Sequence, residues 1–242
     1  MSAFDQVTNT QARPLPVIVL ADTSGSMSVD GKLDSLKKSL IDMIKSFKGA
    51  TASNLETEIY VSIISFGNNS ATTIIEPKSA SEIADSPSFL NAIYAMQANG
   101  NTPLGLALTK ILGMLEHRET YPSRAYRPFL VLASDGHPND KWLDPLNKLL
   151  TSERGKKATR LALAIGADAD EPMLEKFTNN KKIPVFKANN ANEIREFFKC
   201  VTITVEEVSQ SPNPGEITEA EVIKIANNVG LKIAKDADDF FE

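Results

Sequence analysis

The alternation of short apolar segments with amphipathic segments is the feature that most limits how this chain can fold. Five apolar runs are typical of strands buried on both faces, and they span residues 17–20, 59–66, 129–133, 161–165 and 183–186. Apolar residues recur at helical spacing between them, most clearly over 33–47, 104–115 and 194–208. This alternation predicts an α/β fold, a doubly wound and mostly parallel sheet with helices on both faces. Residues 72–75 are expected to add an antiparallel edge strand.

Small oxygen-bearing side chains follow directly on the first predicted strand. Asp22, Ser24 and Ser26 alternate along the chain, so their side chains can share one side of an extended backbone, and Gly25 permits a tight turn between them. One carboxylate and two hydroxyls are hard donors that suit Mg²⁺ or Mn²⁺ better than zinc. The alternative is an ordinary strand-to-helix loop, since Asp and Ser also favour such turns.

Two distant positions are candidates to complete this donor set. Thr102 lies in a Gly-Asn-Thr-Pro-Leu run, and Asp135 lies in a Ser-Asp-Gly run after the apolar strand at 129–133. Open α/β sheets bind ligands at the carboxyl ends of their strands, near the point where the strand order reverses. Because Asp22 and Asp135 both follow strands, we expect one shared site at that edge.

These separated motifs resemble the metal-ion-dependent adhesion site of von Willebrand factor A domains. The resemblance covers roughly residues 13–200, and three motifs in the right order are more specific than any one alone. Residues 22–27 are, in addition, similar to the tellurite-resistance TerY-type proteins. The narrower similarity would place the protein in a bacterial stress system.

The resemblance implies a role for each site residue. Ser24 and Ser26 would bind the cation through their hydroxyls, and Thr102 would join them when a ligand is bound. Asp22 and Asp135 would hold ordered waters on the metal. Because neutral hydroxyls dominate the inner ligands, the cation keeps much of its charge and attracts an Asp or Glu carboxylate from a partner protein. The expected function is metal-dependent protein binding rather than catalysis.

Two other functions remain open. A Mg²⁺-dependent phosphohydrolase would need a second carboxylate two residues after its aspartate nucleophile, where this chain has Ser24. An adaptor subunit of an AAA-type ATPase would use the same fold without the metal. Other enzyme classes are disfavoured, because the chain lacks a Gly-Lys-Ser/Thr phosphate loop, a Gly-x-Ser-x-Gly elbow and zinc-type Cys or His spacing.

Composition limits the cellular setting. The lone Cys200 excludes an internal disulfide, which suits a reducing compartment. No apolar run approaches the roughly 18–20 residues of a membrane span, and the start lacks the basic region of a signal peptide. The basic stretch at 154–160 is short and has no interleaved aromatics, so nucleic acid is not an expected partner. We therefore expect a cytoplasmic protein.

The C-terminal region is predicted to be distinct from the domain at 13–208. Pro and Gly residues indicate a linker over 209–217, and Thr218 with Glu221 forms a capping-box pattern that begins a short helical extension over 218–242. Nine acidic side chains and three lysines lie in 206–242, so the net charge of −5 belongs to this region. The extension is expected to pack on the domain, to fray, or to occupy the metal site. It could occupy the site of its own chain or that of a neighbouring molecule, and the second arrangement would cause self-association.

The loop after Asp135 should line the rim of the site. It contains His137, Asp140 and Trp142. We expect each of them to stabilise the loop rather than to bind a partner. Cys200 lies in an apolar helical stripe and is expected to belong to the core.

Overall fold

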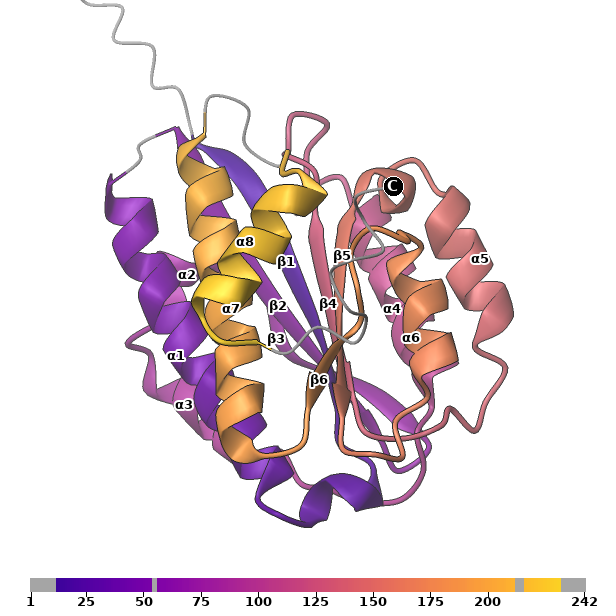
Figure 1. The fold of residues 1–242 in the computed structure, drawn as a ribbon. Helices are drawn as coiled ribbons and strands as arrows, with labels where there is room; N and C mark the ends of the chain where they lie inside the picture. Colours follow the sequence, from indigo (N-terminus) through magenta and orange to yellow (C-terminus); the bar gives the residue numbers. More distant parts are fainter. Residues whose placement is uncertain (1–11, 54–55, 212–215, 232–242) are drawn as a thin grey trace, which may run out of the picture.

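A computed structural model describes residues 12–53, 56–211 and 216–231 (Figure 1). The sheet has six strands in the order β3-β2-β1-β4-β5-β6. Their bounds are β1 (Arg13–Asp22), β2 (Thr57–Gly67), β3 (Ser70–Ser79), β4 (Phe129–Ser134), β5 (Thr159–Ile165) and β6 (Phe186–Ala188). Every neighbouring pair is parallel except β2 and β3, which are antiparallel. The predicted doubly wound sheet with an antiparallel edge strand is confirmed.

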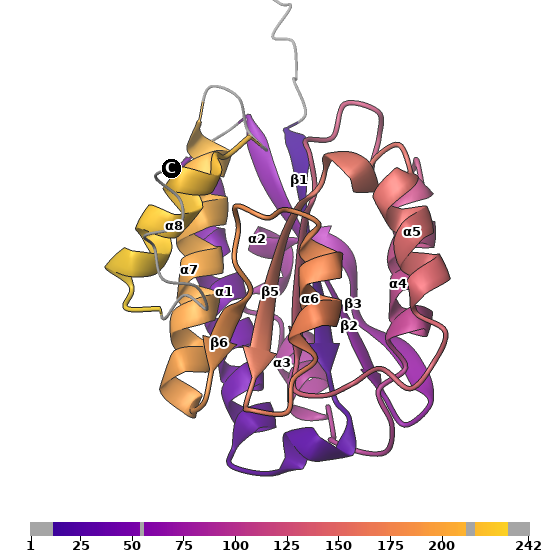
Figure 2. The same cartoon turned by 45° about the vertical axis from the view of Figure 1, so that its right-hand side comes forward.

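Helices cover both faces of the sheet (Figures 1 and 2). One face carries α1 (Lys32–Ser53), α2 (Ala80–Ile83), α3 (Pro87–Tyr94), α7 (Ala191–Gln210) and α8 (Glu219–Asn228), and the other carries α4 (Leu104–Glu116), α5 (Leu143–Thr151) and α6 (Glu171–Thr178). Two 3₁₀ turns, η1 (Gly25–Ser28) and η2 (Gly155–Lys157), complete the described elements. Among the described helices, none is long and apolar enough to traverse a lipid bilayer.

The core consists of two apolar clusters, one on each side of the sheet. Val17 and Val19 of β1 belong to the first cluster, whereas Ile18 and Leu20 belong to the second. Successive side chains of a strand point to opposite faces. Both faces are covered here, which explains why the strand sequences are continuously apolar rather than alternating.

The sequence interpretation was wrong at the last strand. β6 spans Phe186–Ala188, whereas the apolar run predicted a strand over 183–186. Ile183 and Val185 are buried, but the segment that holds them leads into the strand instead of pairing with it. Pro184 lies between them and lacks the backbone N–H that a sheet ladder needs. Burial alone therefore produced the apolar pattern.

The C-terminal helix α8 packs on α7. Val222, Ile225 and Ala226 are buried in the same apolar cluster as α7, and the predicted capping box of Thr218 and Glu221 is present. Helix α7 ends at Gln210, two residues beyond the predicted end of the domain. The acidic residues 236–242 lie outside the described residues.

The strand order reverses between β1 and β4. The chain passes from β1 to β2 on one side, and β4 pairs with β1 on the other side. Asp22 is the last residue of β1, and Asp135 directly follows β4. The fold therefore brings the two carboxylates to neighbouring strand ends, at the edge where this class of sheet binds ligands.

Candidate metal centre

Backbone hydrogen bonds tie the loop after β1 to the end of β2 and to the loop before α4. The N–H of Thr23 donates to the carbonyl of Phe66, and the N–H of Asn99 donates to the carbonyl of Thr23, both at 2.9 Å. The N–H of Gly25 donates to the carbonyl of Gly100, also at 2.9 Å. The loop that carries Thr102 is thus fixed against the loop that follows β1.

Two glycines allow this close approach. A Cβ atom at Gly67 would lie 2.4 Å from the carbonyl oxygen of Thr23, which leaves no space for a side chain. Gly100 has a φ of +62°, and a Cβ atom there would lie 2.8 Å from the Cα of Asn68. The positions of the site loops therefore depend on residues that carry no side chain.

Asp22 is fully buried beneath the site. Its Oδ1 accepts a hydrogen bond from the N–H of Ser24 at 2.8 Å, and its Oδ2 accepts one from the hydroxyl of Ser134 at 2.5 Å. Burial raises the pKa of Asp22 from 3.8 to about 6, although both hydrogen bonds lower the pKa. The negative charge on Asp22 is therefore costly in the metal-free protein, and a nearby cation would stabilise it.

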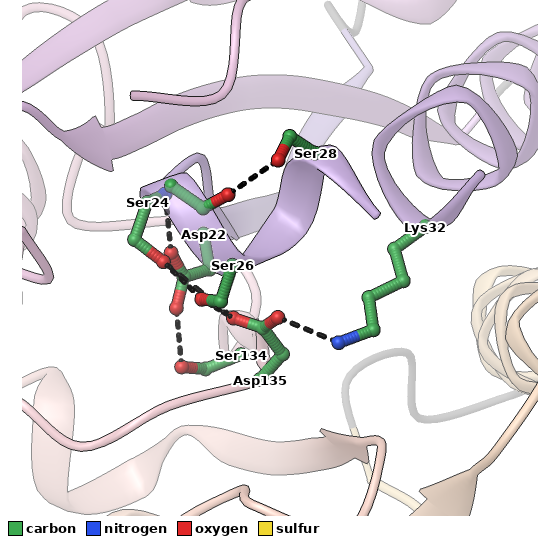
Figure 3. Close-up of polar contacts among 8 residues, drawn as sticks. Asp22, Ser24, Ser26, Ser28, Lys32, Ser134 and Asp135 are labelled. Carbon is green, nitrogen blue, oxygen red and sulfur yellow. Dashed lines mark hydrogen bonds and ion pairs between the residues drawn. The ribbon is translucent and has the colours of Figure 1, made fainter. Parts of the chain in front are cut away.

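Ser24, Ser26 and Asp135 form a compact group of oxygens beside Asp22 (Figure 3). The hydroxyl of Ser26 donates to Oδ1 of Asp135 at 2.7 Å and lies 3.0 Å from the hydroxyl of Ser24. A longer contact of 3.5 Å joins the Ser24 hydroxyl to the same carboxylate oxygen. Ser26 lies in η1 rather than in an extended segment, so the 3₁₀ turn, and not strand alternation alone, brings its side chain to the site.

Thr102 lies near the same group of oxygens, on a third loop. A Cβ atom at Gly136 would lie 3.7 Å from Oγ1 of Thr102 and 3.9 Å from Oγ of Ser26. Thr102 and Asp135 are buried, whereas Ser26 is exposed. All five residues selected from the sequence therefore converge, and the group opens to solvent beside Ser26.

Sequence reasoning missed two residues that contact the site. Lys32, the first residue of α1, places its ammonium nitrogen 2.9 Å from Oδ2 of Asp135. Ser134 orients Asp22 through its hydroxyl, as described above. The Ser-Asp-Gly motif drew attention to Ser134 without a role, whereas no local pattern distinguishes Lys32 from the other lysines of α1.

The three residues predicted at the rim each contact a neighbouring loop or helix. Both carboxylate oxygens of Asp140 accept hydrogen bonds at the start of α4, from the N–H groups of Gly105 at 2.9 Å and Leu106 at 3.1 Å. The Nδ1 of His137 lies 3.0 Å from a carboxylate oxygen of Asp170. Trp142 packs against the second apolar cluster, with the ammonium of Lys176 5.6 Å from its ring centre.

The donor set fits a hard divalent cation. Hydroxyl and carboxylate oxygens are the ligands that Mg²⁺ and similar ions prefer. Within the described ranges, no group of three or more His, Cys, Asp or Glu side chains is arranged to hold a metal. Lys32 supplies one positive charge against the two buried carboxylates of Asp22 and Asp135, which leaves a formal charge of −1 for a cation to offset.

Comparison with known proteins agrees with this geometry. The von Willebrand factor type A domain matches residues 17–199 of the chain. No curated protein gives a significant match over the sequence.

Several solved structures share the fold at low sequence identity. A von Willebrand factor type A protein from Catenulispora acidiphila is 19% identical with a TM-score of 0.61, over 79% of this chain and 42% of that protein. The pilus adhesin SpaC from Lactobacillus rhamnosus GG is 15% identical with a TM-score of 0.67, over 82% and 31% of the two chains.

A third structure has a metal in its adhesion motif. Proximal thread matrix protein 1 from the mussel byssus, described with a zinc-occupied MIDAS motif, is 19% identical with a TM-score of 0.59, over 79% and 48% of the two chains. This chain therefore spans less than half the length of each of these three proteins. The strand order, the oxygen cluster at the reversal point and the match over residues 17–199 together show that the chain belongs to the von Willebrand factor type A domain family.

Proposed function

We propose that this chain is a metal-dependent protein-interaction module. The convergence of Ser24, Ser26 and Asp135 within 2.7–3.5 Å, beside the buried Asp22, carries the proposal. Ser24, Ser26 and Thr102 would hold the cation through their hydroxyls, and Asp22 and Asp135 would support it from the buried side. Such domains typically mediate protein–protein contacts, which supports the same function for this chain.

The chemistry of the donors favours an acidic ligand on the partner. Hydroxyl ligands leave most of the charge on the cation, so an external Asp or Glu carboxylate gains a charge-assisted contact there. Ser26 is exposed at the opening, so a partner's side chain has access. The bound cation supplies charge and a ligand position, and the protein supplies rigid loops to hold both.

The identity of the metal is tested first. Calorimetry with Mg²⁺, Mn²⁺ and Zn²⁺ should show one site for Mg²⁺ or Mn²⁺, and zinc is included because a mussel byssus protein is described with zinc in its MIDAS motif. Asp135→Ala and Asp22→Ala should abolish this binding. The matched control Asp168→Asn removes an exposed carboxylate at the same edge and should leave the binding unchanged. Unaltered Mg²⁺ and Mn²⁺ binding by Asp22→Ala and Asp135→Ala would contradict the assignment.

The partner contact is tested separately with a short acidic peptide as probe. Thr102→Ala should reduce peptide binding to the Mg²⁺-loaded protein at least tenfold and reduce Mg²⁺ binding less, because Thr102 is assigned a direct contact mainly in the ligand-bound state. Thr102→Ser keeps the hydroxyl and should restore peptide binding. Peptide binding at full strength in the presence of EDTA would exclude the metal bridge.

A metal-free adaptor is the second candidate. The ion pair between Lys32 and Asp135 favours it, because the ammonium already partners the carboxylate at 2.9 Å. The adaptor would bind its protein partner, such as an AAA-type ATPase, equally well in EDTA and in Mg²⁺. A Mg²⁺-dependent phosphohydrolase has less support, because the position two residues after Asp22 carries the hydroxyl of Ser24.

The stress-related setting rests on the similarity of residues 22–27 to TerY-type proteins. We propose on that basis a cytoplasmic role in tellurite resistance. Loss of the protein should then sensitise its bacterial host to tellurite, and the Asp135→Ala variant should fail to restore resistance.

A further inference from the structure

A basic pocket lies at the edge of the sheet opposite the candidate metal centre. It occupies about 380 Å³ where β1, β4 and β5 begin. These strands begin at the upper side of Figure 1. Five cationic side chains line it: Arg13, Arg118, Arg127, Arg154 and Lys157. β1 has ten residues, so the pocket and Asp22 are separated by roughly 30 Å at ~3.3 Å per residue.

The pocket concentrates positive charge in a protein with a net charge of −5. Glu153 and Glu216 are the two carboxylates among its lining residues, which leaves a formal charge of +3. Glu153 pairs with Arg118 at 3.1 Å and Glu216 pairs with Arg127 at 2.8 Å. These four side chains are each more than half exposed, so the pairs are weak and can be exchanged for a ligand.

The other three cations have no carboxylate partner within the described part of the chain. Arg13 lies 3.8 Å above the ring of Tyr126 and donates to the carbonyl of Arg124 at 2.8 Å. Arg154 donates to the carbonyl of Pro122 at 2.9 Å. Lys157 is exposed at the rim. No ion pair among the described residues therefore neutralises their positive charges, although the nearby charge of Glu153 partly offsets that of Arg154.

The cations also destabilise one another. The pKa of Arg154 lies below its usual range, first because it is partly buried and then because the charge of Arg118 is close by. Like charges held together in a partly enclosed hollow are stabilised when an anion binds between them.

We propose that the basic pocket binds a small anion that carries a diphosphate group. Guanidinium groups present paired N–H donors that match phosphate oxygens, and a diphosphate concentrates several charges in a volume that this pocket can enclose. A pocket of about 380 Å³ is within the range of small-molecule sites, which begins near ~300 Å³. An acidic peptide fits less well, because its carboxylates carry single charges spaced along an extended chain.

Calorimetry on the full-length protein in EDTA tests the proposal with two probes, pyrophosphate and ADP. EDTA prevents a metal-bound phosphate from being carried to the candidate metal centre, and binding should be unchanged in Asp135→Ala. Pyrophosphate binding tighter than ADP binding would identify a free diphosphate, whereas tighter ADP binding would identify a nucleotide. Either result supports the shared chemistry.

Two variants locate the binding. Arg154→Gln and Lys157→Gln should each lower the affinity for the tighter-binding probe at least tenfold. Arg195→Gln changes an exposed arginine of α7 and should leave this affinity unchanged. The side chain of Lys157 is exposed and makes no contact among those described, so its variant keeps the test valid if Arg154→Gln unfolds. The proposal is overturned if neither probe binds, if Lys157→Gln binds as well as the parent protein, or if a poly-glutamate peptide binds as tightly as pyrophosphate.

Discussion

The ammonium nitrogen of Lys32 lies 2.9 Å from Oδ2 of Asp135, which joins the start of α1 to the carboxyl end of β4. The Asp135 side chain is fully buried, and that of Lys32 is 18% exposed. A lysine of this chain thus contributes positive charge beside the oxygens assigned to the divalent cation. This contact has opposite consequences for the metal-free and the metal-bound protein.

Lys32→Met should destabilise the metal-free protein and strengthen Mg²⁺ binding. Without the ammonium, Asp135 is buried without a cation, and the free energy of unfolding should fall by about 2 kcal/mol, less than for a fully buried pair because Lys32 keeps contact with solvent. Repulsion between Lys32 and the metal disappears, so the Mg²⁺ affinity should rise roughly tenfold, or ~1.4 kcal/mol. Urea unfolding in EDTA and calorimetry measure the two effects. Lys38→Met, on an exposed lysine of the same helix, is the control, and equal behaviour of the two variants would refute the prediction.

The stability of the metal-free protein should depend on pH through Asp22. Burial raises the pKa of Asp22 to about 6 in the folded state, compared with 3.8 ordinarily, so the folded state holds the proton more tightly than the unfolded state. This contribution is complete below about pH 4 and is lost as the pH rises through about 6. The side chain at this position in the Asp22→Asn variant does not titrate. As the pH rises from about 4 to 7, the free energy of unfolding of the parent protein should therefore fall by about 2 kcal/mol relative to that of Asp22→Asn.

Urea unfolding in EDTA across this pH range measures that difference, and a difference that stays constant with pH would contradict the assignment. The same proton competes with the cation. The Mg²⁺ affinity of the parent protein should therefore decline below about pH 6, by at most ~tenfold per pH unit for one proton.

Asp140 should support the fold without taking part in metal binding. It accepts hydrogen bonds from the N–H groups of Gly105 and Leu106, so Asp140→Ala leaves the first turn of α4 uncapped and should cost about 1 kcal/mol of stability. Asp140→Asn keeps one acceptor and should lose less. Thermal unfolding gives the ranking, and calorimetry should show an unchanged Mg²⁺ affinity in both variants. Loss of Mg²⁺ binding in a folded Asp140→Asn protein would instead place Asp140 among the metal-site residues.

The acidic C-terminus should compete with partners for the proposed cation. Helix α8 packs on α7, so the informative deletion starts after it and removes residues 232–242. Tethering raises the effective concentration of the acidic residues to about millimolar. The deletion should tighten the binding of an acidic peptide to the Mg²⁺-loaded protein, or abolish self-association that depends on Mg²⁺. Sedimentation velocity in Mg²⁺ and in EDTA measures the second effect.

A variant that removes the acidic charges but keeps the chain length distinguishes competition for the cation from packing of the C-terminus. Replacing Asp236, Asp238 and Asp239 by Asn keeps the chain length and should reproduce the deletion. If both proteins keep the parent's peptide affinity and oligomeric state, the C-terminus does not reach the metal site.

The sequence by itself determined the layers of the fold and indicated all five residues of the candidate site. Continuous apolar runs identified five of the six strands at least in part, because strands covered on both faces bury every side chain. The capping box of Thr218 and Glu221 was equally readable, because its hydrogen bonds join residues only three positions apart. Asp22, Ser24 and Ser26 were found for the same reason, since their contacts are local.

Only the tertiary structure decided which distant residues meet. Lys32 reaches Asp135 because α1 begins beside the strand-reversal point, and the two residues are 103 positions apart. The basic pocket gathers Arg13 from the start of β1 and Arg118 and Arg154 from two separate loops at the opposite edge. The position of β6 also depends on pairing with β5, which the apolar pattern of 183–186 does not encode. Strand order and loop packing fix these contacts through long-range hydrogen bonds and burial, and a linear pattern carries no record of them.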